Sequence, residues 1–223
     1  MTVHNLLEKE INVGKLTLKN RLVMPAMQTD KALMGRATQE MYKYYLDRAE
    51  YSRPGLIITG HCYIDEAGRV DQQMSIAHED VIEDHYRIAD AIHEGGSVAL
   101  CQISHAGSKA LPSLKGRVSA SEVNTPSNLD DPAPRALEAA GVDLIDVTGG
   151  MCRYLRPGHT EPGYFGSMSA KIKAAVTVTV MVTGGVRSLD DVEALLEAGA
   201  GDLIGAGRVM YHDAYWGKRL ESK

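Results

Sequence analysis

The sequence predicts an α/β protein of the TIM (β/α)8-barrel type, incomplete, with about six recognisable strands. Short apolar runs alternate along the chain with segments whose apolar residues recur at helical spacing. Strands that are apolar on both faces are typical of parallel sheets covered by helices. The 223 residues suffice for one domain with a real core but not comfortably for two. We therefore expect a single domain over residues 1–223.

The first half of the chain predicts a hairpin followed by alternating strands and helices. Apolar and polar residues alternate around Gly14, as in a short hairpin. Continuous apolar runs predict strands, and apolar residues at helical spacing predict helices. The expected elements are a hairpin over 11–18, strands over 20–25, 56–60 and 97–103, and helices over 39–53 and 79–94.

The second half resumes this order after a long interruption. Residues 106–134 carry no strand or helix pattern and contain four prolines, so we expect a loop of a length that is unusual in a compact barrel. The remaining expected elements are strands over 142–147, 176–182 and 202–206, and helices over 134–140, 167–175 and 189–198.

Composition excludes some classes of function. A net charge of −5 gives no basis for nucleic-acid binding. The N-terminus shows neither a signal peptide nor a membrane span, so we expect a cytoplasmic protein. Three cysteines, Cys62, Cys101 and Cys152, lack metal-like spacing, and we expect buried free thiols.

Glycine-rich segments follow two successive strands near the C-terminus. In barrels, functional sites lie at the carboxyl ends of the strands, and phosphate sites often follow the last two. Backbone N–H groups of Gly184, Gly185 and Gly207 can surround a phosphate, and Arg208 adds positive charge. The alternative is that these glycines only make tight turns.

Polar residues also end two of the earlier strands. The carboxamide of Gln102 suits the edge of a pyrimidine-like ring, although a satisfied core amide is an equal alternative. His61 and His105 lie at strand ends as well, and a lone histidine is more often structural than catalytic.

Five segments together resemble the Old Yellow Enzyme family, which includes ene-reductases and 2,4-dienoyl-CoA-reductase-like oxidoreductases. They are Leu18–Met27, Gln102–Gly107, Val142–Gly150, Thr183–Gly185 and Gly205–Arg208. The resemblance implies a barrel that binds FMN. It also implies hydride transfer from NADH or NADPH through FMN to an activated alkene, a small-molecule substrate, and association into a homo-oligomer.

The resemblance also implies roles for single residues. Gln28 stands where relatives place a Cys, Thr or His near the reactive edge of the flavin, and it is a candidate catalytic residue together with His105. We expect His105 to line the pocket without transferring protons. The implied cofactor-binding residues are Pro25, Ala26, Met27 and Gln28 along the flavin, Gly60 beside the ring, Gln102 at the pyrimidine edge, and Gly184, Gly185, Gly207 and Arg208 at the phosphate.

The fourth and fifth strands of the family barrel have no match here, and with them the substrate-binding histidine pair and the tyrosine proton donor are missing. The join falls near residues 128–132. Because losing two strands exposes apolar edges, an omitted segment is favoured over a true deletion, with a break or disorder between Ser119 and Pro134. Alternative functions are a catalytically dead flavin-binding or structural remnant, or another phosphate-binding barrel enzyme.

Overall fold

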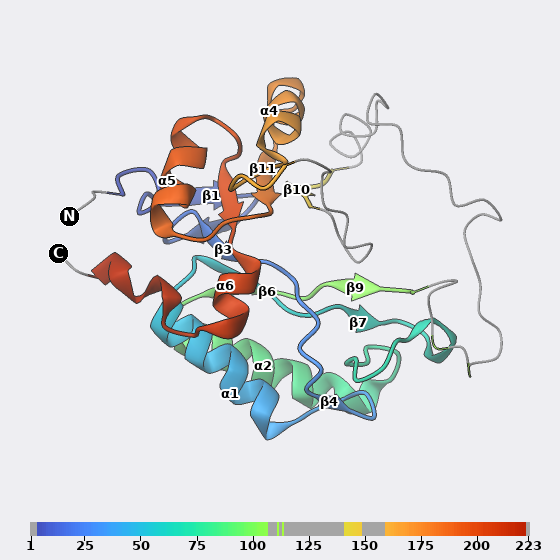
Figure 1. The fold of residues 1–223 in the computed structure, drawn as a ribbon. Helices are drawn as coiled ribbons and strands as arrows, with labels where there is room; N and C mark the ends of the chain where they lie inside the picture. The colour runs from blue at the N-terminus through green and yellow to red at the C-terminus, as the bar shows by residue number, and fades with distance from the viewer. Residues whose placement is uncertain (1–3, 107–110, 112, 114–140, 149–158, 222–223) are drawn as a thin grey trace.

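A computed structural model describes residues 4–106, 111, 113, 141–148 and 159–221 (Figure 1). Its centre is a six-stranded sheet in the order β10-β11-β12-β3-β6-β8, in which every neighbouring pair is parallel. The strands are β3 (Leu22–Met24), β6 (Leu56–Ile58), β8 (Val98–Leu100), β10 (Leu144–Val147), β11 (Thr179–Thr183) and β12 (Leu203–Gly205). The first of these strands lies beside the last, as in a barrel, so the predicted incomplete barrel of six strands is confirmed.

One face of the sheet carries its own apolar core. The register pairs Val23 with Leu56, and Leu56 with Val98, so these side chains point to the same side. They pack with the hairpin formed by β1 (Ile11–Val13) and β2 (Leu16–Leu18). The hairpin closes the amino-terminal end of the strands, because Gly14 lies against Asp143, just before β10.

Helices cover the other face and form the larger core. Figure 1 shows α1 and α2 side by side on one half of the sheet, and α4 and α5 on the half that contains β11 and β12. The helices are α1 (Gln39–Asp47), which continues as the π-helix η1 (Arg48–Ser52), α2 (Ile82–Glu94) after the 3-10 turn η3 (Glu79–Val81), α4 (Gly166–Ala175), α5 (Leu189–Glu197) and α6 (Gly207–His212). Short 3-10 turns η2 (Glu66–Gly68) and η6 (Trp216–Glu221) complete the helical elements.

Local signals explain where two helices begin. The Thr38 side chain accepts a hydrogen bond from the Met41 amide at the start of α1. Ser188 and Asp191 form a capping box at the start of α5. Such caps satisfy amide groups that have no partner inside the helix.

Several elements differ from the expectation. The strand expected over 97–103 is two strands, β8 and β9 (Ile103–Ser104), and β9 pairs with β7 (Cys62–Tyr63) beyond the main sheet. The hairpin of β4 (Ala32–Leu33) and β5 (Arg36–Ala37), and helix α6, were not predicted. The helix expected over 134–140 and the break expected between Ser119 and Pro134 lie outside the described residues.

The two edge strands carry exposed apolar side chains. Among the described residues, β8 and β10 each pair with one neighbour in the main sheet. Leu100 is 40% exposed and Ile103, just beyond the edge, is 62% exposed. These are the positions at which a closed barrel would continue, so the sheet is an open part of a barrel.

A buried carboxylate joins the β4–β5 hairpin to α2. Asp84 accepts hydrogen bonds from Arg36 (2.6 Å), Tyr42 (3.1 Å) and the Ala37 amide (3.3 Å). Burial opposes the charge, but these bonds outweigh it and lower the pKa of Asp84. The stabilisation is therefore fully present above the unfolded-state pKa of about 3.9 and is lost as the pH falls through the lower folded-state value.

We expect Asp84→Asn to lower the free energy of unfolding by about 2 kcal/mol at pH 7, because buried donors lose a charged acceptor. The difference from the unchanged chain should shrink as the pH falls below about 4, measured by urea unfolding across pH. Asp80→Asn is the matched control, since Asp80 also binds Arg36 but is exposed. An equal loss at pH 7 in both variants would contradict this account.

Candidate functional site

The loops that follow the parallel strands share one edge of the sheet. The loops after β6 and β12 each touch the loop after β3 there. A Cβ atom added to Gly60 would lie 2.5 Å from the Met27 carbonyl oxygen, and one added to Gly207 would lie 3.3 Å from Pro25 Cγ and 3.4 Å from Met27 Sδ. The structure thus brings Pro25, Met27, Gly60 and Gly207 together, and larger residues at the two glycine positions would meet these neighbours.

A tyrosine of helix α1 holds the loop after β6 in place. The Gly60 amide donates to the Tyr45 hydroxyl at 2.8 Å, and Tyr45 is fully buried in α1. Burial raises the pKa of Tyr45, so the phenol stays neutral at physiological pH. The buried Tyr45 side chain therefore fixes the position of the Gly60 backbone relative to the sheet.

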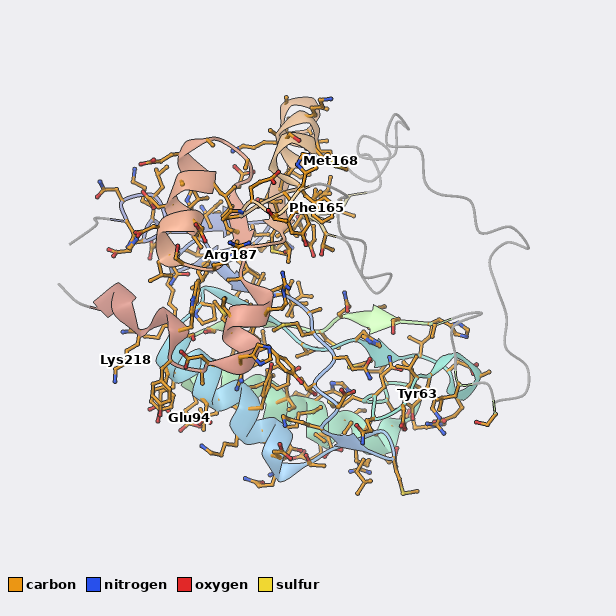
Figure 2. All side chains as sticks on the ribbon, in the orientation of Figure 1. Tyr63, Glu94, Phe165, Met168, Arg187 and Lys218 are labelled. Atoms are coloured by element: carbon orange, nitrogen blue, oxygen red, sulfur yellow. The ribbon has the colours of Figure 1, made fainter. Side chains whose placement is uncertain are left out.

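The loop after β11 contains the glycine pair. Gly185 has a φ of +73°, which favours glycine, and an added Cβ would lie 2.9 Å from both the Tyr164 ring and the Glu161 carbonyl. The Gly163 amide donates to the Gly184 carbonyl at 2.8 Å. Residues 160–165 therefore pack on the glycine pair, and Figure 2 places Phe165 and Arg187 in this part of the molecule.

Gly207 and Arg208 begin α6, and the Arg208 side chain is exposed. The other end of this six-residue helix is held by Arg48, which donates to the carbonyls of Met210 (2.8 Å) and Tyr211 (2.6 Å). Arg48 thereby positions a loop that contains two of the predicted phosphate-binding residues.

Gln28 and His105 each contact residues of the segment that follows β7. The exposed Gln28 amide donates to Asp30 Oδ1 (2.6 Å) and to the Asp71 carbonyl (3.1 Å). His105 follows β9, and its ring lies against Gly68. Gln102 is exposed and lies between β8 and β9, and its carbonyl accepts from the Cys62 amide at 2.7 Å.

His61 has the properties of a structural histidine. Its Nδ1 lies 2.6 Å from the amide of Gln73 and 3.1 Å from the Ser104 hydroxyl. An amide nitrogen can only donate, so Nδ1 accepts and the ring is neutral. Burial lowers the pKa of His61, which agrees with this state.

Asp146 was missed by the sequence reasoning. Its carboxylate lies 3.2 Å from the Thr183 hydroxyl, on the concave side of β10. The side chain reaches solvent at the open edge, but partial loss of its hydration to the surrounding protein raises the pKa of the Asp146 carboxyl to about 6. A charged residue within the otherwise apolar run Leu144–Val147 was the signal that could have identified it.

The cysteines differ in part from the expectation of buried thiols. Cys62 is buried and free, whereas Cys101 is free but exposed, so the prediction was wrong for Cys101. Their sulfur atoms are 3.7 Å apart. Cys152 and the glycines Gly149 and Gly150 lie outside the described residues.

Residues 7–134 match the NADH:flavin oxidoreductase / NADH oxidase family. The chain belongs to this family. Two relatives are a metal reductase of Desulforamulus reducens, 30% identical over 122 residues, and an NADH:acrylate oxidoreductase of Vibrio harveyi, 37% identical over 101 residues. These alignments cover 55% and 44% of this chain but only 18% and 10% of the relatives, so the chain spans a small part of their length.

Solved structures show that the fold of this family member extends beyond the matched half. A 2-naphthoyl-CoA reductase superposes with a TM-score of 0.82 at 15% identity, covering 98% of this chain and 52% of the other. The Old Yellow Enzyme homologue from Zymomonas mobilis gives 0.66 at 17% identity, covering 96% and 92%. The incomplete barrel is therefore the Old Yellow Enzyme fold with part of the barrel missing from the described structure.

Proposed function

We propose that this chain is the flavin-binding part of an FMN-dependent oxidoreductase, which carries hydride from NADH or NADPH through FMN to an activated alkene. The observation that carries the proposal is the contact among the loops after β3, β6 and β12, in a chain of the NADH:flavin oxidoreductase family. An α,β-unsaturated carbonyl or enoyl compound is the proposed substrate, supported by the acrylate oxidoreductase among the relatives.

The residues at this edge fit a flat aromatic cofactor with a phosphate tail. Because Gly60 and Gly207 carry no side chain, the loops after β6 and β12 can pack closely on Pro25 and Met27, and the proposed ring lies along the backbone edge that these loops form. The proposed binding residues are Pro25, Ala26, Met27 and Gln28 along the ring, Gly60 beside it, Gln102 at its pyrimidine edge, and Gly184, Gly185, Gly207 and Arg208 at the phosphate. A bound flavin supplies the hydride chemistry, while these residues orient it and exclude water.

The proposed roles of Gln28 and His105 are modest. The Gln28 carboxamide donates hydrogen bonds to Asp30 and Asp71. It can therefore donate to a bound molecule only after one of these two bonds breaks. His105 lines the substrate side without transferring protons.

We also propose a cytoplasmic homo-oligomer. The free thiols of Cys62 and Cys101 suit a reducing compartment, and the exposed apolar edge at Leu100 favours association. Among the residues that the structure describes, no helix has both the length and the apolar character needed to cross a bilayer.

The open sheet favours a second candidate, an inactive remnant that binds flavin but reduces nothing. The edges at β8 and β10 leave room for the missing fourth and fifth strands of the barrel, where relatives hold their substrates according to the resemblance. Bound flavin without oxidation of NADH or NADPH would select this candidate. A colourless protein that binds a sugar phosphate would instead select another phosphate-binding barrel enzyme.

The absorption spectrum of the purified protein after incubation with FMN and desalting tests flavin binding. We expect a retained flavin spectrum at about one FMN per chain. Arg208→Ala should weaken FMN binding roughly 10- to 100-fold through loss of a charge-assisted bond to phosphate. Arg87→Ala, at an exposed arginine of α2, should leave it unchanged. A folded protein that stays colourless would contradict the proposal.

A further inference from the structure

Three metal-ligating side chains gather where the segments after β6 and β8 meet helix α2. Cys62 lies on β7, Cys101 directly follows β8, and His85 is on α2. One ligand atom from each lies within 4.8 Å of the other two. The three residues therefore form a compact cluster held by separate elements of the fold.

The spacing of the two sulfur atoms suits a tetrahedral metal ion. Zinc binds thiolate sulfur at about 2.3 Å with tetrahedral angles, which places two such sulfurs about 3.8 Å apart. The observed separation between Cys62 and Cys101 is 3.7 Å. A disulfide would require the sulfurs to approach to about 2.05 Å, so the present geometry is closer to that of two metal ligands.

The histidine is oriented as metal-binding histidines usually are. His85 Nε2 lies 2.8 Å from the Ser75 carbonyl, so this nitrogen carries the proton and donates it. Nδ1 is left as the ligand atom. A backbone carbonyl on the second ring nitrogen is the usual outer partner of a metal-bound histidine, because it fixes the tautomer and the ring orientation.

An unsatisfied hydroxyl provides a second, independent sign of a ligand. Thr59 is 7% exposed, and its Oγ1 makes no hydrogen bond among the described residues. A buried hydroxyl without a partner is costly, and a metal-bound water would satisfy it.

The cluster opens into a cavity of about 430 Å³ between β8 and α2. Thr59, His85 and Cys101 line one part of it, and the rest is mostly apolar. Three protein ligands beside an open space are typical of zinc sites that keep one position for water or an exogenous ligand. The volume is in the range of small-molecule pockets.

We propose that Cys62, Cys101 and His85 bind a zinc ion whose fourth position faces this cavity. The site adjoins the proposed flavin site, since Cys62 Sγ lies 3.5 Å from the Gly60 carbonyl, but the cavity that it faces is lined by Ala99 and by side chains of α2.

The test is titration of the full chain with Co²⁺ under reducing, oxygen-free conditions, with any affinity tag removed. We expect one Co²⁺ per chain, with thiolate-to-cobalt charge-transfer absorption and the visible bands of tetrahedral cobalt, all lost when Zn²⁺ is added. Cys101→Ser and His85→Asn should each weaken binding roughly 100-fold or more. The control His78→Asn should leave binding unchanged, because His78 lines the cavity but is outside the cluster.

Three results would overturn the proposal: absence of tetrahedral cobalt bands, undiminished binding by Cys101→Ser, or a Cys62–Cys101 disulfide whose reduced form takes up no metal. Cys62 is fully buried, so Cys62→Ser could fail to fold. Exposed Cys101 is therefore the primary variant, and circular dichroism confirms that each variant is folded before titration.

Discussion

Replacing Arg48 with methionine is expected to lower the free energy of unfolding by about 4 kcal/mol. The buried guanidinium donates to the carbonyls of Met210, Tyr44 and Tyr211, at 2.8, 3.0 and 2.6 Å. It also lies 3.5 Å from the centre of the Tyr44 ring. Methionine fills much of the volume but donates no hydrogen bond, so carbonyls buried around the guanidinium lose their partner, at about 1–3 kcal/mol each.

Urea unfolding measures this loss, and FMN retention provides a second readout. Because α6 begins at Gly207 and Arg208, loosening its far end should also weaken FMN binding. Arg87→Met is the matched control: Arg87 lies 4.0 Å from the Tyr42 ring but is exposed, and its loss should cost less than about 0.5 kcal/mol. Arg48→Met with a stability within 1 kcal/mol of the unchanged chain would contradict this role for Arg48.

Glu193→Ala is expected to cost about 3 kcal/mol and to release the N-terminal segment. The two carboxylate oxygens of this buried residue accept from the amides of Leu6 and Leu7, each at 2.8 Å. Leu7 is fully buried in the main core. Removing the carboxylate leaves the amides of Leu6 and Leu7 without an acceptor, and the Leu7 side chain is then held less firmly in the core.

Thermal and urea unfolding measure the stability, and hydrogen exchange at Leu6 and Leu7 reports the local effect. Both amides should exchange faster in Glu193→Ala. The amides of β12 should still exchange at the rate that the global free energy of unfolding sets. Glu197→Ala, one turn further along α5 and exposed, should change stability by less than about 0.5 kcal/mol. Alanine has a higher helix propensity than glutamate, so helix propensity cannot produce the loss. Equal effects of the two substitutions would contradict the role given to the bonds with the N-terminal segment.

Local patterns were sufficient to predict most of the fold. The hairpin, the strands β3, β6, β10, β11 and β12, and the helices α1, α2, α4 and α5 all lie within or close to the expected ranges. The β7–β9 pair escaped detection because each strand has two residues and the partners are about 40 positions apart in the chain. Helix α6 escaped because six residues that begin with glycine carry too little periodicity.

The candidate sites were predictable to different degrees. Glycines after successive strands pointed to the edge where Gly60 and Gly207 meet the β3 loop, since parallel strands bring their carboxyl ends together. The cluster of Cys62, His85 and Cys101 had no such signal, because its members are widely separated in sequence and come from β7, from α2 and from the segment after β8.

The sequence by itself determined the order of strands and helices, and with it the barrel architecture, because hydrophobic periodicity is a local property that each segment carries alone. The tertiary structure decided which side chains meet. Only the docking of α2 on β8 places His85 beside Cys101, and only loop packing directs the Gln28 amide to Asp71. Such contacts depend on register and helix placement, which are set by the packing of the whole core and leave no local pattern in the chain.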